Sequence, residues 1–172
     1  MLRLRFTNFS GVVWRHTAIE QPPLDVLLNA SRGGRFNPPM SFPMLYTSMT
    51  VIGAKAEFIK SARAVNADPE LLLPRMLHQI EVNPQNVVDL TDKRNRDFFG
   101  CSFKELIGKD WTQTQKIGTQ LHNVCDAILS YSAADSKHKN LNLYIINPIS
   151  ISVSESTMIQ KMSDWDYIKP IK

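Results

Sequence analysis

Residues 31–58 read SRGGRFNPPMSFPMLYTSMTVIGAKAEF, and we expect the protein to be built around this stretch. Residues 31–43 hold two glycines and three prolines, a composition that predicts a loop. Residues 44–47 predict a short strand. Residues 50–66 predict an amphipathic helix, because their apolar side chains recur at steps of three and four. A loop, a strand and a helix therefore follow one another directly.

Three side chains of this stretch carry chemistry that a ligand could use. Arg35 follows the pair Gly33-Gly34 and presents a planar guanidinium beside backbone that a ligand can approach closely. Tyr46 lies in the predicted strand, and Glu57 lies at the flank of the predicted helix, about 100° from the centre of its apolar stripe. The arginine suits a pyrophosphate or a carboxylate, yet neither GxxxxGK[ST] nor GxGxxG is present. A turn with a solvated arginine, a core tyrosine and a solvated glutamate remain the alternatives.

The rest of the chain mixes short helices with short strands. Strands are predicted at 2–6, 12–14, 76–82, 86–90, 140–147 and 151–153, short helices within 92–108, and a helical apolar stripe over 114–128. The sequence contains no internal repeat and no linker long enough to separate one domain from another. We therefore expect residues 1–172 to form one domain of the α+β or α/β class, with mixed β-sheets and flanking helices.

Composition narrows the class of protein. With 43% hydrophobic and 21% charged residues, the chain is typical of a globular protein. The net charge is +4, but the basic residues are scattered, so we expect no direct binding to nucleic acid. No apolar run approaches the roughly 18 residues of a membrane span, and residues 1–11 lack the apolar core of a signal peptide. We expect a cytoplasmic protein with no membrane partner.

Cysteine and histidine patterns predict neither a disulfide framework nor a metal site. Cys101 and Cys125 have no CxxC partners and suit a reducing compartment as buried residues. The four histidines show no HxH or HExxH spacing, so no metal is expected.

Several strings of the sequence resemble the RES domain family. These are GGRFNPP at 33–39, LYTS at 45–48 and AE at 56–57, followed in the family's order by VVDLTD at 87–92, DW at 110–111, TQKIG at 114–118, ILSYSA at 128–133 and NLNLYIINP at 140–148. The resemblance covers about residues 11–148. It implies an α+β fold similar to that of the ADP-ribosyltransferases.

The resemblance also implies an activity and partners. RES proteins are toxins of bacterial RES–Xre toxin–antitoxin pairs that consume NAD+ by hydrolysis or phosphorolysis, and some instead transfer ADP-ribose to a protein. We therefore expect NAD+ as substrate without a metal, an Xre-like antitoxin on a separate chain, and the bacterial cytoplasm as location. A homodimer is left open. The alternatives are a protein ADP-ribosyltransferase and, from another class, a non-catalytic binding module.

Residue by residue, the resemblance assigns catalytic roles to Arg35 of GGRF, Tyr46 of LYTS and Glu57 of AE. The resemblance assigns four residues to the binding of NAD+: Arg15, Arg35, Tyr46 and Ser132.

Ser132 is expected to form a hydrogen bond with a ribose hydroxyl or with the carboxamide of NAD+. Ser130, two residues before Ser132, is the alternative to it. His16, beside Arg15, is a weaker candidate for a base.

Overall fold

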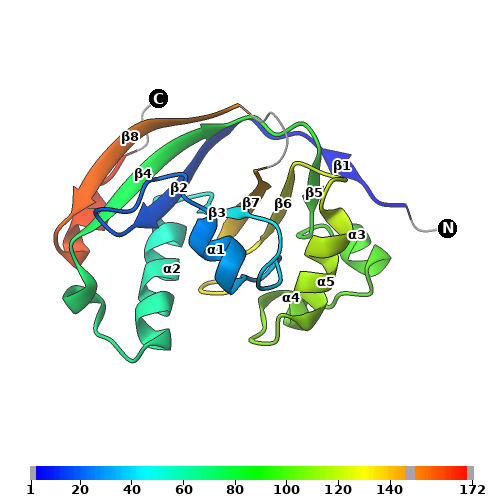
Figure 1. Ribbon diagram of the computed structural model, residues 1–172, viewed down its shortest axis with the longest axis horizontal. Helices are drawn as coiled ribbons and strands as arrows, with labels where there is room; N and C mark the ends of the chain where they lie inside the picture. Colours follow the sequence, from blue (N-terminus) through cyan, green and yellow to red (C-terminus); the bar gives the residue numbers. More distant parts are fainter. Residues whose placement is uncertain (1–2, 146–149, 170–172) are drawn as a thin grey trace.

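An eight-stranded sheet forms the frame of the protein (Figure 1). The computed structural model describes residues 3–145 and 150–169. The strands are β1 (Phe6–Thr7), β2 (Gly11–Thr17), β3 (Met44–Ser48), β4 (Arg75–Val82), β5 (Val87–Asp89), β6 (Ala127–Tyr131), β7 (Lys139–Tyr144) and β8 (Ile151–Ile159). They lie in the order β1-β5-β6-β7-β3-β2-β4-β8. Neighbouring strands are antiparallel except β5 and β6, so the sheet is mixed.

The helices lie beneath the arch that the strands form in Figure 1. The α-helices are α1 (Leu27–Arg32), α2 (Val51–Ala64), α3 (Lys93–Phe98), α4 (Phe103–Ile107) and α5 (Thr112–Leu121), and the 3₁₀ helices are η1 (Pro69–Leu72) and η2 (Met162–Tyr167). In that view α2 lies under β2 and β4, and α3, α4 and α5 lie toward the β5 and β1 end. The predicted α+β fold, a mixed sheet with flanking helices, is confirmed.

The sheet separates into two halves between β2 and β3. These strands pair at a single register position, Trp14 with Ser48, whereas β2 pairs with β4 along its whole length. Each half has its own helical core: α2 packs Ala54 and Phe58 against Trp14, and α5 packs Ile117 into a second cluster with β5, β6 and β7. A third cluster draws on strands of both halves and joins them. The space between the two helical cores is where a site can form.

Strand alternation decides which side chains face the helices. On β3, Leu45 joins the cluster shared by both half-sheets, while Met44 and Tyr46 pack with the α5 core. On β7, Leu141 and Leu143 likewise face the shared cluster. Because successive residues of a strand point to opposite faces, the asparagines between and before these leucines face the helices.

Most predicted elements of the central stretch are confirmed. The helix predicted at 50–66 is α2, and the side chain of Thr50 caps it by accepting a hydrogen bond from the Gly53 amide at 3.0 Å. The strand predicted at 44–47 is β3, and residues 33–43 form the predicted loop, while 31–32 complete α1. Both cysteines are buried, as expected.

Three predicted boundaries are wrong or lie partly outside the described residues. The apolar stripe over 114–128 is not one helix, because α5 ends at Leu121, Asn123 adopts a left-handed conformation (φ 67°), and Ile128 belongs to β6. Residues 124, 125 and 128 fit helical spacing, but Val124 is exposed in a turn, and only Cys125 and Ile128 pack into the core. The strand predicted at 2–6 is reduced to β1. Of the strand predicted at 140–147, β7 accounts for the residues up to Tyr144, and 146–147 lie outside the described residues.

The loop that contains Arg35 is held in place by α5. At Gly118 the helix lies against the backbone carbonyl of Phe36 so closely that a Cβ atom has no room. The phenol of Tyr144 donates to the carbonyl of Gly118 at 2.6 Å, and the amide of Gln115 donates to the carbonyl of Gly34 at 2.9 Å. The loop conformation therefore depends on a glycine of a helix distant in sequence.

Replacing Gly118 with alanine should displace the loop or the helix, because the new methyl group overlaps the Phe36 carbonyl. We expect the free energy of unfolding to fall by about 1–3 kcal/mol, measured by urea denaturation. Gln120→Ala, at an exposed position of the same helix, is the control and should change stability by less than ~0.5 kcal/mol. Equal stability of Gly118→Ala and the parent would show that the close contact between Gly118 and the Phe36 carbonyl does not hold the loop in place.

Candidate active site

A cavity of about 330 Å³ opens where the two halves of the sheet diverge. Strand β2, the loop before β3, strand β3, helix α2 and strands β6 and β7 all contribute side chains to it. The lining includes Trp14, Arg15, His16, Asn29, Gly34, Arg35, Phe36, Met44, Tyr46, Thr47, Ser48, Ala54, Glu57, Lys60, Ser61, Trp111, Ser130, Ala133, Asn140 and Asn142. Four residues expected from the sequence, Arg15, Arg35, Tyr46 and Glu57, thus line one cavity.

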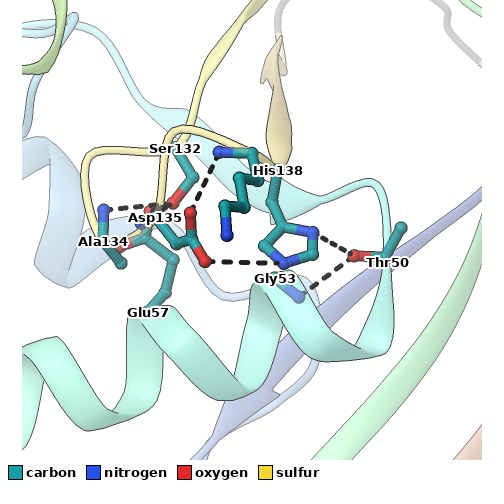
Figure 2. A network of polar contacts seen from close by, with 8 residues as sticks. Thr50, Gly53, Glu57, Ser132, Ala134, Asp135 and His138 are labelled. Carbon is teal, nitrogen blue, oxygen red and sulfur yellow. Dashed lines mark hydrogen bonds and ion pairs between the residues drawn. The ribbon is translucent and has the colours of Figure 1, made fainter.

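Glu57 is held in one orientation from a single side. Its Oε1 accepts hydrogen bonds from the hydroxyl of Ser132 at 2.7 Å and from the side-chain amide of Asn140 at 2.8 Å. Figure 2 shows Glu57 on α2 facing the loop that carries Ser132. Because hydrogen bonds to an ionised acceptor are stronger than neutral ones, this arrangement favours a fixed carboxylate.

Arg35 is anchored through one nitrogen of its guanidinium. Nη1 donates to the backbone carbonyls of Leu106 at 2.9 Å and Gly108 at 3.0 Å, at the end of α4. The guanidinium carbon lies 5.7 Å from the centre of the Trp111 ring, a cation–π distance. Burial lowers the pKa of Arg35, and the charge of Glu57 partly opposes that shift. The fixed arginine therefore presents its positive charge to the cavity.

Two further cations line the cavity. Arg15 donates through Nη2 to the backbone carbonyl of Asp25 at 2.6 Å, and burial lowers its pKa while Asp25 raises it. Lys60 follows Glu57 by nearly one turn of α2, and burial lowers its pKa despite the attraction of Glu57. Among the described residues that line the cavity, three cations thus accompany one carboxylate. Such a balance favours an anionic ligand.

Tyr46 ties the strand to the glycine loop. Its phenol oxygen accepts a hydrogen bond from the Phe36 amide and donates one to the side chain of Asn37, both at 2.8 Å. A Cβ atom on Gly34 would lie 2.6 Å from that oxygen, so the glycine permits the close approach. Burial raises the pKa of Tyr46 well above its usual value. The phenol is neutral and committed to the loop, while the residue still lines the cavity.

His16 is a neutral imidazole rather than a base. The guanidinium of Arg75, which can only donate, lies 3.2 Å from Nδ1, so Nδ1 accepts and the ring hydrogen is on Nε2. Burial lowers the pKa of His16 to about 3, with further lowering by Arg75, Arg15 and His78. Both ring nitrogens are therefore assigned, and His16 has no free lone pair with which to take a proton.

Ser132 occupies a different position from the one expected. It is fully buried and lies behind Glu57, not at the surface of the cavity, whereas Ser130 does line the cavity. The predicted direct contact of Ser132 with NAD+ has no geometric support, because its hydroxyl is used by Glu57. Contacts of Arg15, Arg35, Tyr46 and Glu57 with a nucleotide stay predictions.

Sequence reasoning missed Lys60, Asn140 and Asn142. The signal for the asparagines was present: NLNL at 140–143 alternates amide and leucine, which places both amides on one face of a strand. Lys60 is three residues after Glu57, a spacing that places two helical side chains on neighbouring positions of one face.

Two searches of the described residues were negative. Residues 3–145 and 150–169 contain no group of three or more histidine, cysteine, aspartate or glutamate side chains arranged to hold a metal ion. In the same segments of the chain, no helix has the length and apolar character needed to cross a membrane.

Fold and cavity together define an α+β protein with a cavity lined by three cations and one carboxylate between two half-sheets. The particular family follows from comparison with known proteins: the model of the RES domain matches residues 12–168, and the chain belongs to this family. The resemblance expected over about residues 11–148 is thus confirmed.

Curated proteins similar to the chain include NAD(+) phosphorylases. A protein named NAD(+) phosphorylase MbcT, from Mycobacterium bovis and Mycobacterium tuberculosis, is 30% identical over 113 residues, 64% of this chain. A second M. tuberculosis protein, named as a probable NAD(+) phosphorylase, is 30% identical over 128 residues, 74% of this chain. Each match spans 61% of the relative's length.

The fold is also found in a crystal structure of the M. tuberculosis MbcT–MbcA toxin–antitoxin complex. One chain of that structure superposes with a TM-score of 0.84 at 22% identity, covering 94% of this chain and 90% of its own length. The similarity confirms the fold over nearly the whole chain.

The neutral state of His16 predicts a pH dependence of stability. Its pKa of about 3 in the folded protein lies below the ordinary value near 6.5, so the unfolded chain binds the proton more tightly. The contribution of His16 is complete above about pH 6.5 and is lost as the pH falls toward 3. In His16→Gln, the decline of the unfolding free energy over this range should be shallower, by at most ~1.4 kcal/mol per pH unit. Parallel curves in urea denaturation would contradict the assignment.

Proposed function

We propose that this chain cleaves NAD+ at the bond between nicotinamide and ribose, with inorganic phosphate or water as acceptor. The observation that carries the proposal is the convergence of a fixed carboxylate, Glu57, with Arg15, Arg35 and Lys60 in one cavity. The names of the similar proteins, NAD(+) phosphorylases, support the same substrate.

The chemistry of NAD+ explains why a carboxylate is useful. When the glycosidic bond breaks, its electron pair goes to the pyridinium nitrogen and nicotinamide leaves as a neutral molecule, so no acid is needed. Positive charge grows on the ribose, and a carboxylate beside it stabilises that charge. Unit charges about 4 Å apart at an effective dielectric near 20 interact by about 4 kcal/mol. Glu57 could therefore supply close to a thousandfold in rate.

The cations suit the other end of the substrate. Arg35 and Arg15 can hold the pyrophosphate through charge-assisted hydrogen bonds, and anchoring of each arginine to backbone carbonyls reduces the entropy lost on binding. The neutral ring of Tyr46 can lie against nicotinamide. In this arrangement the cavity binds the dinucleotide through its phosphates and leaves the ribose near Glu57.

One experiment tests the proposal directly. Purified protein is incubated with NAD+ and the release of nicotinamide is followed with and without inorganic phosphate. Release in both conditions indicates hydrolysis, and release that requires phosphate, with ADP-ribose 1″-phosphate as product, indicates phosphorolysis. An absence of release under both conditions, in folded protein, would contradict the proposal.

Two alternatives give different results in related assays. A protein ADP-ribosyltransferase would share the first bond-breaking step, and labelled ADP-ribose from NAD+ would appear on a protein of a lysate. A non-catalytic binding module would bind its ligand without consuming NAD+. The clustering of Glu57 with three cations favours catalysis over the module.

The proposed setting is the bacterial cytoplasm, with a separate antitoxin chain that closes the cavity. An uninhibited enzyme would drain cellular NAD+, so a physical block of the cavity containing Arg35 and Glu57 is the direct means of control. The fold shared with a toxin of a toxin–antitoxin complex supports this. Expression of the chain alone should slow growth, and co-expression of the neighbouring gene should restore it. Growth that stays slow would contradict the partner proposal.

Glu57→Gln should remove most of the activity without unfolding the protein. The substitution keeps size and hydrogen-bonding capacity but removes the charge, and Glu57 lies outside the apolar stripe of α2. We expect the rate of NAD+ consumption to fall by about a hundred- to a thousandfold. Circular dichroism must first show a folded variant. A folded variant with the parent rate would show that the carboxylate has no catalytic role.

Arg35→Ala, unlike Glu57→Gln, should weaken the binding of NAD+ as well as its turnover. Loss of the anchored guanidinium weakens binding of the pyrophosphate, so the KM for NAD+ should rise as well as kcat fall. Calorimetry with ADP-ribose measures the contribution of Arg35 to binding affinity independently of turnover. Unchanged affinity for ADP-ribose would remove Arg35 from the proposed phosphate contacts.

A further inference from the structure

We infer that Asn140 is a positioning residue that turns the Glu57 carboxylate so that Oε2 is the oxygen presented to the substrate. The inference rests on the proposed function, because it assigns a reason for the orientation of the proposed catalytic group. The carrying observation is that two side-chain donors meet on the same oxygen, Oε1, from β7 and from the loop after β6.

The hydrogen-bond pattern leaves the second carboxylate oxygen unused by the protein. Oε1 accepts from Asn140 Nδ2 at 2.8 Å and from Ser132 Oγ at 2.7 Å. Within residues 3–145 and 150–169, no hydrogen bond ends on Oε2. Glu57 itself lines the cavity and is only half-buried. A carboxylate held by one oxygen therefore keeps the other for a ligand.

Ser132 can act only as a donor toward Glu57. Its oxygen already accepts from the backbone amides of Ala134 at 3.1 Å and Asp135 at 3.3 Å, as Figure 2 shows for the loop around it. The same loop is fastened to the start of α2, where the ring of His138 lies 3.3 Å from the Thr50 hydroxyl. Ser132 is thus a fixed element of the scaffold behind Glu57.

The orientation of the Asn140 amide is set by a neighbour on β3. The hydroxyl of Ser48 donates to Asn140 Oδ1 at 3.1 Å, and Ser48 is the register partner of Asn140 in the β3–β7 pair. With Oδ1 occupied by a donor, Nδ2 must face Glu57. Ser48 thus donates to Asn140, and Asn140 donates to the carboxylate of Glu57, so the role of this series of hydrogen bonds is to orient the carboxylate.

Two substitutions separate this role from a purely structural one. Asn140→Asp keeps the shape but replaces the donor with a second carboxylate, and Asn140→Ala removes the donor and leaves a gap. If Asn140 only fills space, the alanine variant should be the more damaged. If it aims Glu57, the aspartate variant should be the more damaged, because like charges repel.

In steady-state assays with NAD+ we expect kcat to fall about tenfold in Asn140→Ala and about a hundredfold in Asn140→Asp, with KM within about threefold of the parent. A fall in kcat at a nearly unchanged KM is expected of a misdirected catalytic carboxylate and not of a general loss of substrate binding. A KM that rises as much as kcat falls, or an alanine variant worse than the aspartate variant, would overturn the inference.

Asn142→Ala is the matched control for the change in kcat. This asparagine lies on the same strand and the same face and also lines the cavity, but its amide donates to the Ile128 carbonyl and the Ser130 hydroxyl at 3.2 Å, not to Glu57. Its kcat should fall by less than that of Asn140→Ala. A kcat that falls as far in Asn142→Ala as in Asn140→Ala would indicate a general effect of losing a cavity amide and would overturn the inference.

A readout without turnover keeps the inference separate from the proposed function. In NMR spectra, the side-chain amide resonances of Asn140 should differ between the parent and Glu57→Gln, because a neutral acceptor replaces the carboxylate that the amide contacts. If the parent consumes no NAD+, the proposed function fails while this comparison still decides whether Asn140 contacts the Glu57 carboxylate. Asn140 resonances at the same position in both proteins would overturn the inference.

Discussion

The close contact between α5 and the Phe36 carbonyl at Gly118 is the constraint on which the site depends. It brings a helix from the second half of the chain against the loop of residues 33–37, where the phenol of Tyr46 and the amide of Gln115 complete the loop's hydrogen bonds. Because tightly packed protein interiors have low compressibility, the loop backbone can take few other positions. Arg35 is therefore held toward the cavity by the packing of its own loop and by the end of α4.

The divergence of the two half-sheets forms the cavity and leaves the hydrophobic core of each half intact. Trp14 and Ser48 keep β2 and β3 together at one point, and each half buries its own helix. Arg15, Arg35 and Glu57 at the divergence are each held by hydrogen bonds to other parts of the protein. The same arrangement keeps His16 neutral, because burial and neighbouring cations both disfavour its charged form.

Two levels of support hold Glu57. The helix α2, capped by Thr50, sets the position of its backbone, and donors from β7 and the loop after β6 set the direction of its carboxylate. A cation-rich cavity alone would attract the carboxylate into ion pairs with Arg35 or Lys60. Hydrogen bonds from neutral donors hold Glu57 without neutralising it, so both the carboxylate and the cations stay available to a ligand.

Local patterns in the sequence determined the loop at 33–43, strand β3, helix α2 and the flank position of Glu57, because turn residues and apolar spacing act over a few residues. Family motifs added Arg15, Arg35, Tyr46 and Glu57. Tertiary structure alone decided that Ser132 lies behind Glu57 rather than in the cavity, that Asn140 and Lys60 join the site, and that the stripe over 114–128 breaks after Leu121. The reason is physical: periodicity fixes which face of an element is apolar, whereas hydrogen-bond partners 75 or 83 residues apart are set by how the elements pack.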